Sequence, residues 1–419
     1  MIDLKETLCR YFYRYTAIPS QSRAGADTVP SSPGQAELAR LLAEDLAALG
    51  LTEIAVSEHS VVTACLPARL PEGHAPVPAV GWCCHMDTVD VKLSPEIHPV
   101  LIRSYAGGDI CQNPEKGIYI LASEHPELEH YIGDDILVSD GTSVLGADNK
   151  AAIANVMTML TVLWEDSSIP HGEIRIAFVP DEEIGLLGAK SMDLSSFPVD
   201  YAYTIDCCAL GELVFETFNA GSAWLDITGV TAHPMSSKNN LVNPSMVAVD
   251  FINLLDRAET PEHTENKEGY IWVTGIQSDS LHARVSMNIR DHDRKKYLAK
   301  QDYLRAALEL IQRKHPRAQL SLRFEDVYGN IRDAVTETNR GCIDALYRGM
   351  DELGITPQVL AMRGGTDGSW LSVQGILTPN YFTGAHNFHA VSEFLPLSSF
   401  VLSCRLTLKL VELAVRSAE

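Results

Sequence analysis

The stretch IRIAFVPDEEIG at residues 174–185 decides how this chain folds. Its first six residues form a short, mostly apolar run, which predicts a buried strand over 174–179. Three consecutive carboxylates follow directly, at the end of a strand where the ligand sites of α/β sheets form. Solvated loop acids need no such hydrophobic lead-in, so this stretch indicates an α/β fold with a site at the carboxyl edge of its sheet.

Similar patterns on either side place this strand in an alternation of helices and strands. Short apolar segments predict further strands over 77–84 and 201–205. A helix that starts at Asp148 and has one apolar stripe over 153–163 separates the first of these from the strand at 174–179, and an amphipathic helix over 35–49 precedes them all. This order is typical of an α/β domain.

From about residue 219 the pattern changes to that of a smaller α+β insert. Alternating strands are expected over 223–228, 282–290 and 320–324, separated by a helix that Asn243 caps and a helix over 301–314. After residue 330 the α/β pattern returns, with helices near 335–353 and 397–416. We therefore expect a two-domain protein, in which a mixed-sheet α/β domain of residues 1–218 and 331–419 is interrupted by an α+β lid of residues 219–330.

Composition and charge exclude several classes of protein. The 419 residues are 46% apolar and 21% charged, as in an ordinary globular protein. Lys and Arg total 33 against 55 Asp and Glu, and the net charge of −22 argues against nucleic acid or an anionic membrane as partner. The nine cysteines include no C-x-x-C pair, and we see no secretory signal and no apolar run near the about 18 residues of a membrane span. We expect a cytoplasmic protein without a disulfide framework.

Side chains with metal-ligating chemistry stand where several of these elements begin or end. His85 and Asp87 close a strand on the same face, so the carboxylate can reach the imidazole and orient it as a ligand. Asp148 stands at a helix start, where a simple N-cap is the other reading. Glu182 and Glu183 can act as general base and metal ligand, and Asp206 ends the next strand.

One histidine among so many carboxylates suits zinc or a similar divalent ion, and it suggests two ions that share one acid. A second histidine is then expected further along the chain. His386 and His389 are the candidates, and for either one a core or surface role is the alternative.

In order and spacing, the chain resembles the co-catalytic di-zinc exopeptidases related to carboxypeptidase G, and within them the peptidase T branch. The motifs that carry the resemblance run nearly end to end: HMDTVD at 85–90, VLGAD at 144–148, PDEEIG at 180–185, TID at 204–206, GELVFETFNA at 211–220, AHP at 232–234, NIRD at 288–291, MRGGTDGSWLS at 362–372 and HNFHAVSEF at 386–394.

The resemblance implies a role for each candidate residue. It makes His85 and Asp206 ligands of one zinc and Glu183 and His389 ligands of the other, with Asp148 as the bridge. Asp87 orients His85, and Glu182 is the general base. His389 is preferred to His386 because the family places its ligand histidine four residues before an acid, here Glu393. The family also implies a cis peptide bond between Asp148 and Asn149.

The resemblance further implies a metallo-aminopeptidase that removes the N-terminal residue from short peptides, tripeptides above all. His233 on the lid would polarise the scissile carbonyl, while Arg290 and Arg363 would bind the free carboxylate of the substrate, a surface salt bridge being the alternative for each arginine. A dipeptidase or an N-acyl amino acid deacylase on the same scaffold is the alternative activity, and a non-catalytic binding protein is a further one. We also expect a homodimer formed through the lid.

Three positions depart from the peptidase T pattern. Cys207 and Cys208 replace small glycines beside Asp206, Met235 replaces the glycine after His-Pro, and Asn149 replaces an Asp. The metal ligands are unchanged. The departures bear on the size of the pocket and on substrate preference, since two thiols beside a metal site narrow it and could oxidise or bind metal.

Overall fold

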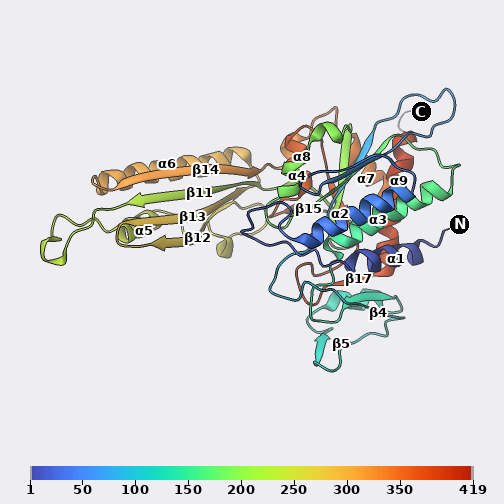
Figure 1. Ribbon diagram of the computed structural model, residues 1–419, viewed down its shortest axis with the longest axis horizontal. Coiled ribbons are helices and arrows are strands. Elements are labelled where there is room, and N and C mark those ends of the chain that lie inside the picture. Colours follow the sequence, from blue (N-terminus) through green and yellow to red (C-terminus); the bar gives the residue numbers. More distant parts are fainter. Residues whose placement is uncertain (1, 417–419) are drawn as a thin grey trace. The chain divides into compact units, whose positions relative to one another are not determined.

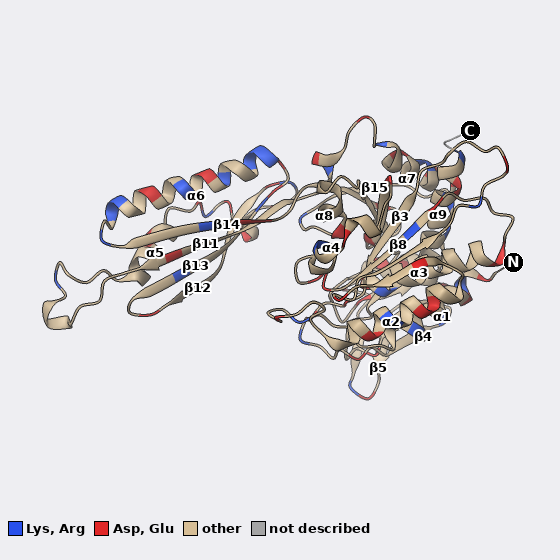
Figure 2. Cartoon of the chain, turned by 45° about the horizontal axis from the view of Figure 1, so that its top comes forward, with Lys and Arg blue, Asp and Glu red and all other residues tan. Residues whose placement is uncertain are grey.

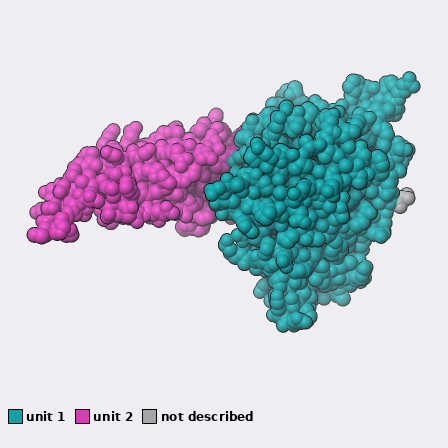
Figure 3. Space-filling view, viewed as in Figure 1, with its two compact units in different colours: residues 1–215, 335–360, 366–419 teal, residues 216–334, 361–365 magenta. Residues whose placement is uncertain are grey.

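The structure is a computed structural model that describes residues 2–416. The chain forms two compact units (Figure 3). Unit 1 runs up to Phe215 and adds residues 335–360 and the chain from Thr366 onward, whereas unit 2 comprises residues 216–334 and 361–365. Unit 2 thus contains the predicted insert, extends it by a few residues at each end, and takes in one short later segment.

An eight-stranded mixed sheet forms the core of unit 1 (Figure 1). In sheet order its strands are β1 (Thr52–Val56), β2 (Val62–Leu66), β8 (Ile174–Val179), β3 (Val80–His85), β9 (Tyr201–Cys207), β16 (Asn380–Phe382), β10 (Glu212–Thr217) and β15 (Gln358–Met362). The central strands β8, β3, β9 and β16 are parallel, so their carboxyl ends meet at one edge. The predicted mixed-sheet α/β fold is confirmed.

Helices cover both faces of this sheet. The helices of unit 1 are α1 (Leu4–Thr16), α2 (Pro33–Ala48), α3 (Ala147–Glu165), α4 (Leu187–Ser191), α7 (Gly341–Glu352), α8 (Asp367–Val373) and α9 (Leu397–Arg416). On one face Trp82 and Tyr381 join α9 through the chain of contacts Trp82 Nε1 to Tyr381 Oη to Thr407 Oγ1. Leu371 of α8 packs on the opposite face, against Cys83.

A small subdomain of residues 99–139 projects from unit 1 and was not predicted. It contains β4 (Pro99–Ile102), β5 (Ile110–Asn113), β6 (Ile118–Ile120) and β7 (Ile136–Ser139), and Figure 1 labels β4 and β5. Strand β17 (Phe394–Pro396) pairs with β7. Its own apolar core joins residues such as Tyr105, Leu128 and Val138 to Phe394. The later chain segment is therefore built into the subdomain.

Unit 2 is a four-stranded antiparallel sheet with two helices on one face. Its elements are β11 (Asn219–Thr228), α5 (Pro244–Ile252), β12 (Tyr270–Ser278), β13 (His282–Asp291), α6 (Arg294–Lys314) and β14 (Gln319–Tyr328), with the strand order β12-β13-β11-β14. Phe251 of α5 and Leu304 of α6 pack on the buried face, whereas on the other face the guanidinium of Arg323 lies 4.0 Å from the Trp224 ring centroid. The predicted α+β insert with one solvated face is thus observed.

The starts of the two helices of unit 2 differ in how well the local sequence predicted them. The Asn243 side chain accepts from the Ser245 N–H and Pro244 is the first residue of α5, as predicted. Helix α6 begins at Arg294 rather than near 301, because Asp293 caps it through the Lys295 and Lys296 amides. Its first two turns contribute only Tyr297 to the buried apolar stripe and are otherwise largely basic (Figure 2), so the apolar spacing that marks a helix is weak there. Within residues 2–416 no helix is long and apolar enough to cross a membrane.

Candidate metal centre

Five predicted ligands converge at the edge where the parallel strands of unit 1 end. His85 is the last residue of β3, Asp206 lies near the end of β9, and Glu183 follows β8. Asp148 lies in the first turn of α3, and His389 lies in the loop between β16 and β17. Their ligand atoms fall into groups whose members lie within 4.8 Å of one another: His85, Asp148 and Asp206; Asp148, Glu183 and His389; and His85, Glu182 and Glu183.

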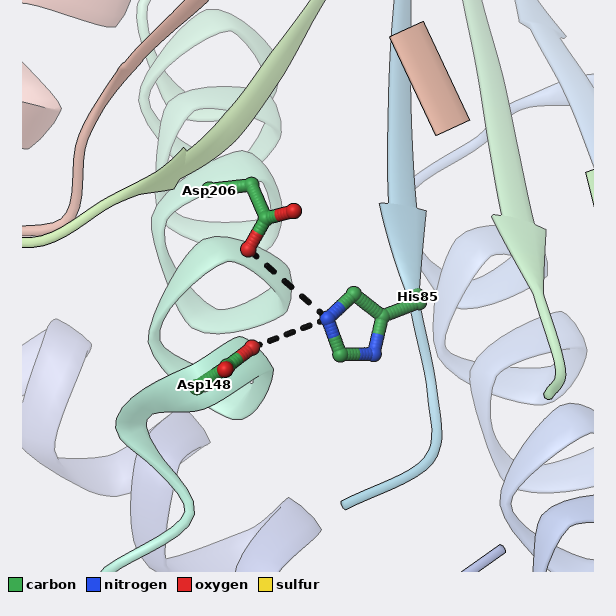
Figure 4. A group of neighbouring side chains, drawn as sticks. All are labelled: His85, Asp148 and Asp206. Carbon is green, nitrogen blue, oxygen red and sulfur yellow. Dashed lines mark hydrogen bonds and ion pairs between the residues drawn. The ribbon is translucent and has the colours of Figure 1, made fainter. Parts of the chain in front are cut away.

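Asp148 joins the two histidines. One carboxylate oxygen, Oδ1, lies 2.9 Å from Nε2 of His85, and the other, Oδ2, lies 3.0 Å from Nε2 of His389. On the first side Asp206 Oδ1 is 3.8 Å from the same nitrogen of His85 (Figure 4). On the second side Glu183 Oε1 is 3.0 Å from Nε2 of His389. The centre therefore consists of two candidate ligand sets that share a single carboxylate.

The backbone at the start of α3 aims Asp148 into the centre. Gly146 takes the N-cap position with a φ of +72°, and Asp148 has a non-helical ψ of 99°. The Asp148–Asn149 peptide bond is cis, as expected. Since both carboxylate oxygens face histidines, the N-cap reading of Asp148 is wrong.

Asp87 contacts both the end of β3 and the turn that follows β8. Its carboxylate is fully buried, and Oδ1 lies 3.3 Å from Nδ1 of His85. The same carboxylate accepts from the backbone N–H groups of Glu182 (3.0 Å) and Glu183 (3.2 Å). Asp87 therefore orients the His85 ring and also positions the two glutamates, a second function that the sequence did not suggest.

The charges of this centre suit a cation. Burial would lower the pKa of His85, but its contacts with Asp148, Asp206 and Asp87 outweigh burial and raise that pKa well above its usual value. Contacts with Asp148 and Glu183 raise the pKa of His389 to about 10. Burial, helped by Asp148, raises the pKa of Glu183 to about 7. Without a cation the groups retain protons, and imidazole nitrogens with carboxylate oxygens are a donor set that suits a divalent metal ion.

Glu182 lies beside this donor set. Burial, supported by the charges of Asp206, Asp367 and Glu183, raises the pKa of Glu182 well above that of a free side chain. A carboxylate with a raised pKa is a stronger base. The position and the environment of Glu182 thus fit a group that accepts a proton.

Asp181 is a buried acid whose structural part sequence reasoning missed. It has a φ of +56°, and its carboxylate accepts from the Ser31 N–H (2.6 Å), the Ser31 hydroxyl (2.5 Å) and the Gln35 amide (2.6 Å). The turn that carries Glu182 and Glu183 is thereby fixed to the start of α2. A run of three acids offered no means of telling which one turns inward.

Asp367 and Glu393 are two further acids at the centre that sequence reasoning did not place there. Asp367 begins α8, is 2% exposed, and among the described residues no hydrogen bond reaches its buried Oδ1. Burial, helped by Asp206, raises its pKa to about 8. Glu393 accepts from the backbone N–H groups of Gly146 (2.9 Å) and Asp148 (3.2 Å). The Thr366–Ser369 capping box marks the start of α8, but it does not show that Asp367 lies at the centre.

The two thiols beside Asp206 differ in exposure. Cys207 is buried, and Cys208 is half-buried, with its backbone N–H donating to Glu212. Burial raises the pKa of both thiols, so both stay protonated at neutral pH. Since the thiolate is the reactive and metal-binding form, neither cysteine is activated in this environment.

The three predicted substrate residues lie in unit 2. His233 is exposed in the loop after β11, and its Nδ1 accepts from the Met235 N–H. Nη1 of Arg290 donates to the carbonyls of Gly221 and Ile289. Arg363 donates to Asn266 O, Glu268 O and Thr264 Oγ1, all in one loop of unit 2. The guanidinium groups also lie over aromatic rings, that of Arg290 over Tyr328 and that of Arg363 over Phe218 and Tyr270. Among residues 2–416 neither arginine is paired with a carboxylate, so the salt-bridge alternative is not observed.

His386, the other histidine candidate, has a different environment. Its Nε2 lies 2.7 Å from the Tyr131 hydroxyl, and its ring stacks on Phe394 with centroids 4.7 Å apart. It belongs to none of the three ligand groups of the described residues.

Comparison with known proteins places the chain in a family. Residues 146–413 match Peptidase family M20/M25/M40. A peptidase T-like protein of Yersinia pestis is 52% identical over 97% of both chains, and the peptidase T of Geobacillus kaustophilus is 37% identical over 99% of this chain and 100% of its own.

Solved structures share the fold. Aminopeptidase PepT of Bacillus cereus superimposes with a TM-score of 0.75 at 21% identity, covering 98% of this chain and 99% of its own. A tripeptidase of Staphylococcus aureus gives 0.74 at 21% identity, covering 99% and 100%. The chain therefore belongs to peptidase family M20/M25/M40, in the branch formed by peptidase T and the peptidase T-like proteins.

Proposed function

We propose that this protein is a two-metal aminopeptidase that removes the N-terminal residue from tripeptides. The observation that carries the proposal is the Asp148 carboxylate, whose two oxygens face His85 and His389 at 2.9 and 3.0 Å. A carboxylate between two ligand sets is what a pair of neighbouring ions requires.

The donor set supports zinc as the metal. His85, Asp206 and Asp148 would hold one ion, and His389, Glu183 and Asp148 the other. Zinc binds imidazole nitrogen and carboxylate oxygen at about 2.0–2.2 Å, and the side chains lie close enough to reach it with small adjustments. Two such ions, when bound, acidify water and polarise a carbonyl.

Glu182 would perform the proton transfers. Held by Asp87 through its backbone N–H, it takes a proton from the attacking water and delivers it to the nitrogen of the leaving amine. The raised pKa of Glu182 favours the first transfer. One carboxyl group then acts as base and afterwards as acid, and no other proton carrier is needed.

The substrate residues support specificity for short peptides. The curated relatives are named peptidase T, and the solved neighbours are described as an aminopeptidase and a tripeptidase. Within the described residues, Nη2 and Nε of Arg290 have no hydrogen-bond partner, and these two groups can bind a carboxylate bidentately. In Arg363, by contrast, both Nη1 and Nη2 donate to unit 2, and only Nε has no hydrogen-bond partner among the described residues. His233 would polarise the scissile carbonyl.

A substrate panel tests this proposal. We expect release of the N-terminal residue from a tripeptide such as Ala-Ala-Ala, loss of turnover on treatment with a chelator, and its return with zinc. An N-acetylated tripeptide should be a poor substrate. Faster cleavage of N-acyl amino acids than of tripeptides would instead establish the deacylase alternative, and preference for dipeptides would establish a dipeptidase.

Two further expectations accompany the proposal. A homodimer through unit 2 is supported by large apolar side chains exposed on α5 and β12, Met246 (54%) and Ile276 (55%) among them. Sedimentation of the protein, and of a Met246→Glu variant, tests it. The cytoplasmic location stays a prediction from the sequence.

A further inference from the structure

The loop of residues 384–394, here called the His389 loop, has a backbone that needs support. Its φ angles are +59° at Asn387 and +65° at His389. Residues with side chains rarely adopt this left-handed region, which costs free energy and persists where surrounding contacts impose it. Contacts from neighbouring segments therefore hold the loop in this form.

The two histidines of the centre are oriented differently. The Nδ1 atom of His85 is held by Asp87, the usual arrangement for a histidine ligand. Among the described residues, the hydrogen-bond and ion-pair partners of the His389 ring are Asp148 and Glu183, both on Nε2. The side chain of His389 is 46% exposed. Since no described residue contacts Nδ1, this ring lacks the orienting contact that His85 has, and its direction relies on its Nε2 contacts and on the backbone of the loop.

Glu393 fixes one side of the His389 loop. Its carboxylate accepts from the backbone N–H groups of Gly146 and Asp148, and it therefore links the end of the loop to the bridging acid. The other side of the loop faces the subdomain of residues 99–139.

Tyr131 of the subdomain contacts His386 directly. The Tyr131 hydroxyl lies 2.7 Å from Nε2 of His386, and the two rings meet edge to face at 5.4 Å. Burial lowers the pKa of His386 to about 4, so the ring is neutral and its Nε2 can accept from the hydroxyl. His386 also stacks on Phe394, and the two residues exchange backbone hydrogen bonds. This contact closes the base of the His389 loop.

Other subdomain side chains hold the tip of the loop. The Asn387 amide lies 3.1 Å from Nδ1 of His125 and 3.2 Å from Oε1 of Glu127. Gln112 donates to the Val391 carbonyl at 3.0 Å. The contacts thus fall on both sides of His389 in the sequence.

We propose that Tyr131, acting through His386, is a positioning residue for His389, and that the subdomain of residues 99–139 thereby sets the affinity of the Asp148, Glu183 and His389 ligand set for its metal ion. The inference rests on the proposed two-metal function and extends it to residues remote from the ligands. It gives the subdomain a function in metal binding.

Tyr131→Phe tests the proposal, because it removes the hydroxyl and keeps the ring. The metal-free variant is titrated with zinc in competition with a chromophoric chelator. We expect two sites, of which one is weakened 10–100-fold, the usual effect of removing a group that orients a ligand, while the other keeps its wild-type affinity. Turnover should fall at limiting zinc and recover in excess zinc, which a general loss of folding would not produce.

Tyr105→Phe is the matched control. Tyr105 is buried in the core of the same subdomain, and its hydroxyl donates to the Gly108 carbonyl, away from the His389 loop. We expect this variant to keep both zinc affinities. Asn387→Gly tolerates the left-handed backbone and removes the contacts to His125 and Glu127 together with one bond to the Ser392 carbonyl within the loop. It should behave like Tyr131→Phe.

The outcomes separate the two proposals. Wild-type affinities at both sites in Tyr131→Phe and Asn387→Gly would overturn the positioning proposal and leave the two-metal function intact. Equal weakening in Tyr105→Phe would also overturn it, because the effect would then be general destabilisation of the subdomain. A wild-type protein that binds fewer than two zinc ions would overturn the proposed function itself.

Discussion

Replacing Glu182 by Gln should separate catalysis from metal binding. The amide has the same size and keeps an oxygen, and the backbone N–H of residue 182 still donates to Asp87 at 3.0 Å, so the turn stays in place. The amide cannot accept a proton. General base catalysis contributes about 10²–10⁴ in rate, so kcat should fall by that factor, which corresponds to about 2.7–5.4 kcal/mol of transition-state stabilisation at 1.36 kcal/mol per decade.

The assay is the initial rate of N-terminal residue release from a tripeptide at saturating zinc, together with zinc content by elemental analysis. Glu183→Gln is the matched control, since it changes the neighbouring acid, whose Oε1 lies 3.0 Å from His389. It should lower zinc content, whereas Glu182→Gln should retain two ions. Near-wild-type turnover by Glu182→Gln with both ions bound would refute the reasoning, because the base would then be another group.

Three more predictions concern pH, substrate and packing. The pKa values of Glu183 (about 7) and His389 (about 10) are raised in the metal-free protein, which therefore loses stability as the pH rises through these values. Metal binding, in contrast, requires both groups to be deprotonated. Zinc should therefore raise the melting temperature more at pH 8.5 than at pH 6, and equal shifts would contradict this. Arg290→Ala should reduce kcat/KM on tripeptides by tens to thousands of fold, because breaking a charge pair costs about 2–5 kcal/mol. The same variant should hydrolyse C-terminally amidated peptides at nearly the wild-type kcat/KM, since these have no carboxylate. Equal losses on both substrates would mean that Arg290 has only a structural role. Gly188→Ala places a Cβ 2.1 Å from the Pro180 carbonyl oxygen, next to the turn that carries Glu182 and Glu183. This overlap should lower the free energy of unfolding by about 1–3 kcal/mol in denaturant titration, and an unchanged midpoint would show that the backbone adjusts to it.

The parts of the fold that were predicted have strong local signals. The strand at 174–179 and the helix at 397–416 have the predicted bounds, because each is a continuous run with clear periodicity. The subdomain of residues 99–139 was missed because its strands have only three or four residues. Segments of that length show no period, and they become strands only by pairing with partners such as β17.

The candidate site divides in a similar way. The positions of strand ends and the family resemblance predicted five ligands, and the structure brings their ligand atoms together: His85, Asp148, Glu183, Asp206 and His389. Asp367 lay outside this reasoning because its neighbours at the centre come from other elements, and no local pattern shows such proximity. The resemblance could not show that both Nη atoms of Arg363 donate hydrogen bonds to a loop of unit 2, since hydrogen bonding depends on three-dimensional neighbours.

The order of the ligands along the chain has a consequence for protein synthesis. His85, Asp148, Glu183 and Asp206 all precede unit 2, and His389 follows it. Because the ribosome makes the N-terminal part first, four ligands and then the whole of unit 2 are in place before the fifth ligand exists. A nascent or prematurely terminated chain that ends before β16 can offer the set of His85, Asp148 and Asp206 but never the set that needs His389. The five-residue ligand set is therefore complete only after His389 has been made, so chains that stop before it lack part of the centre.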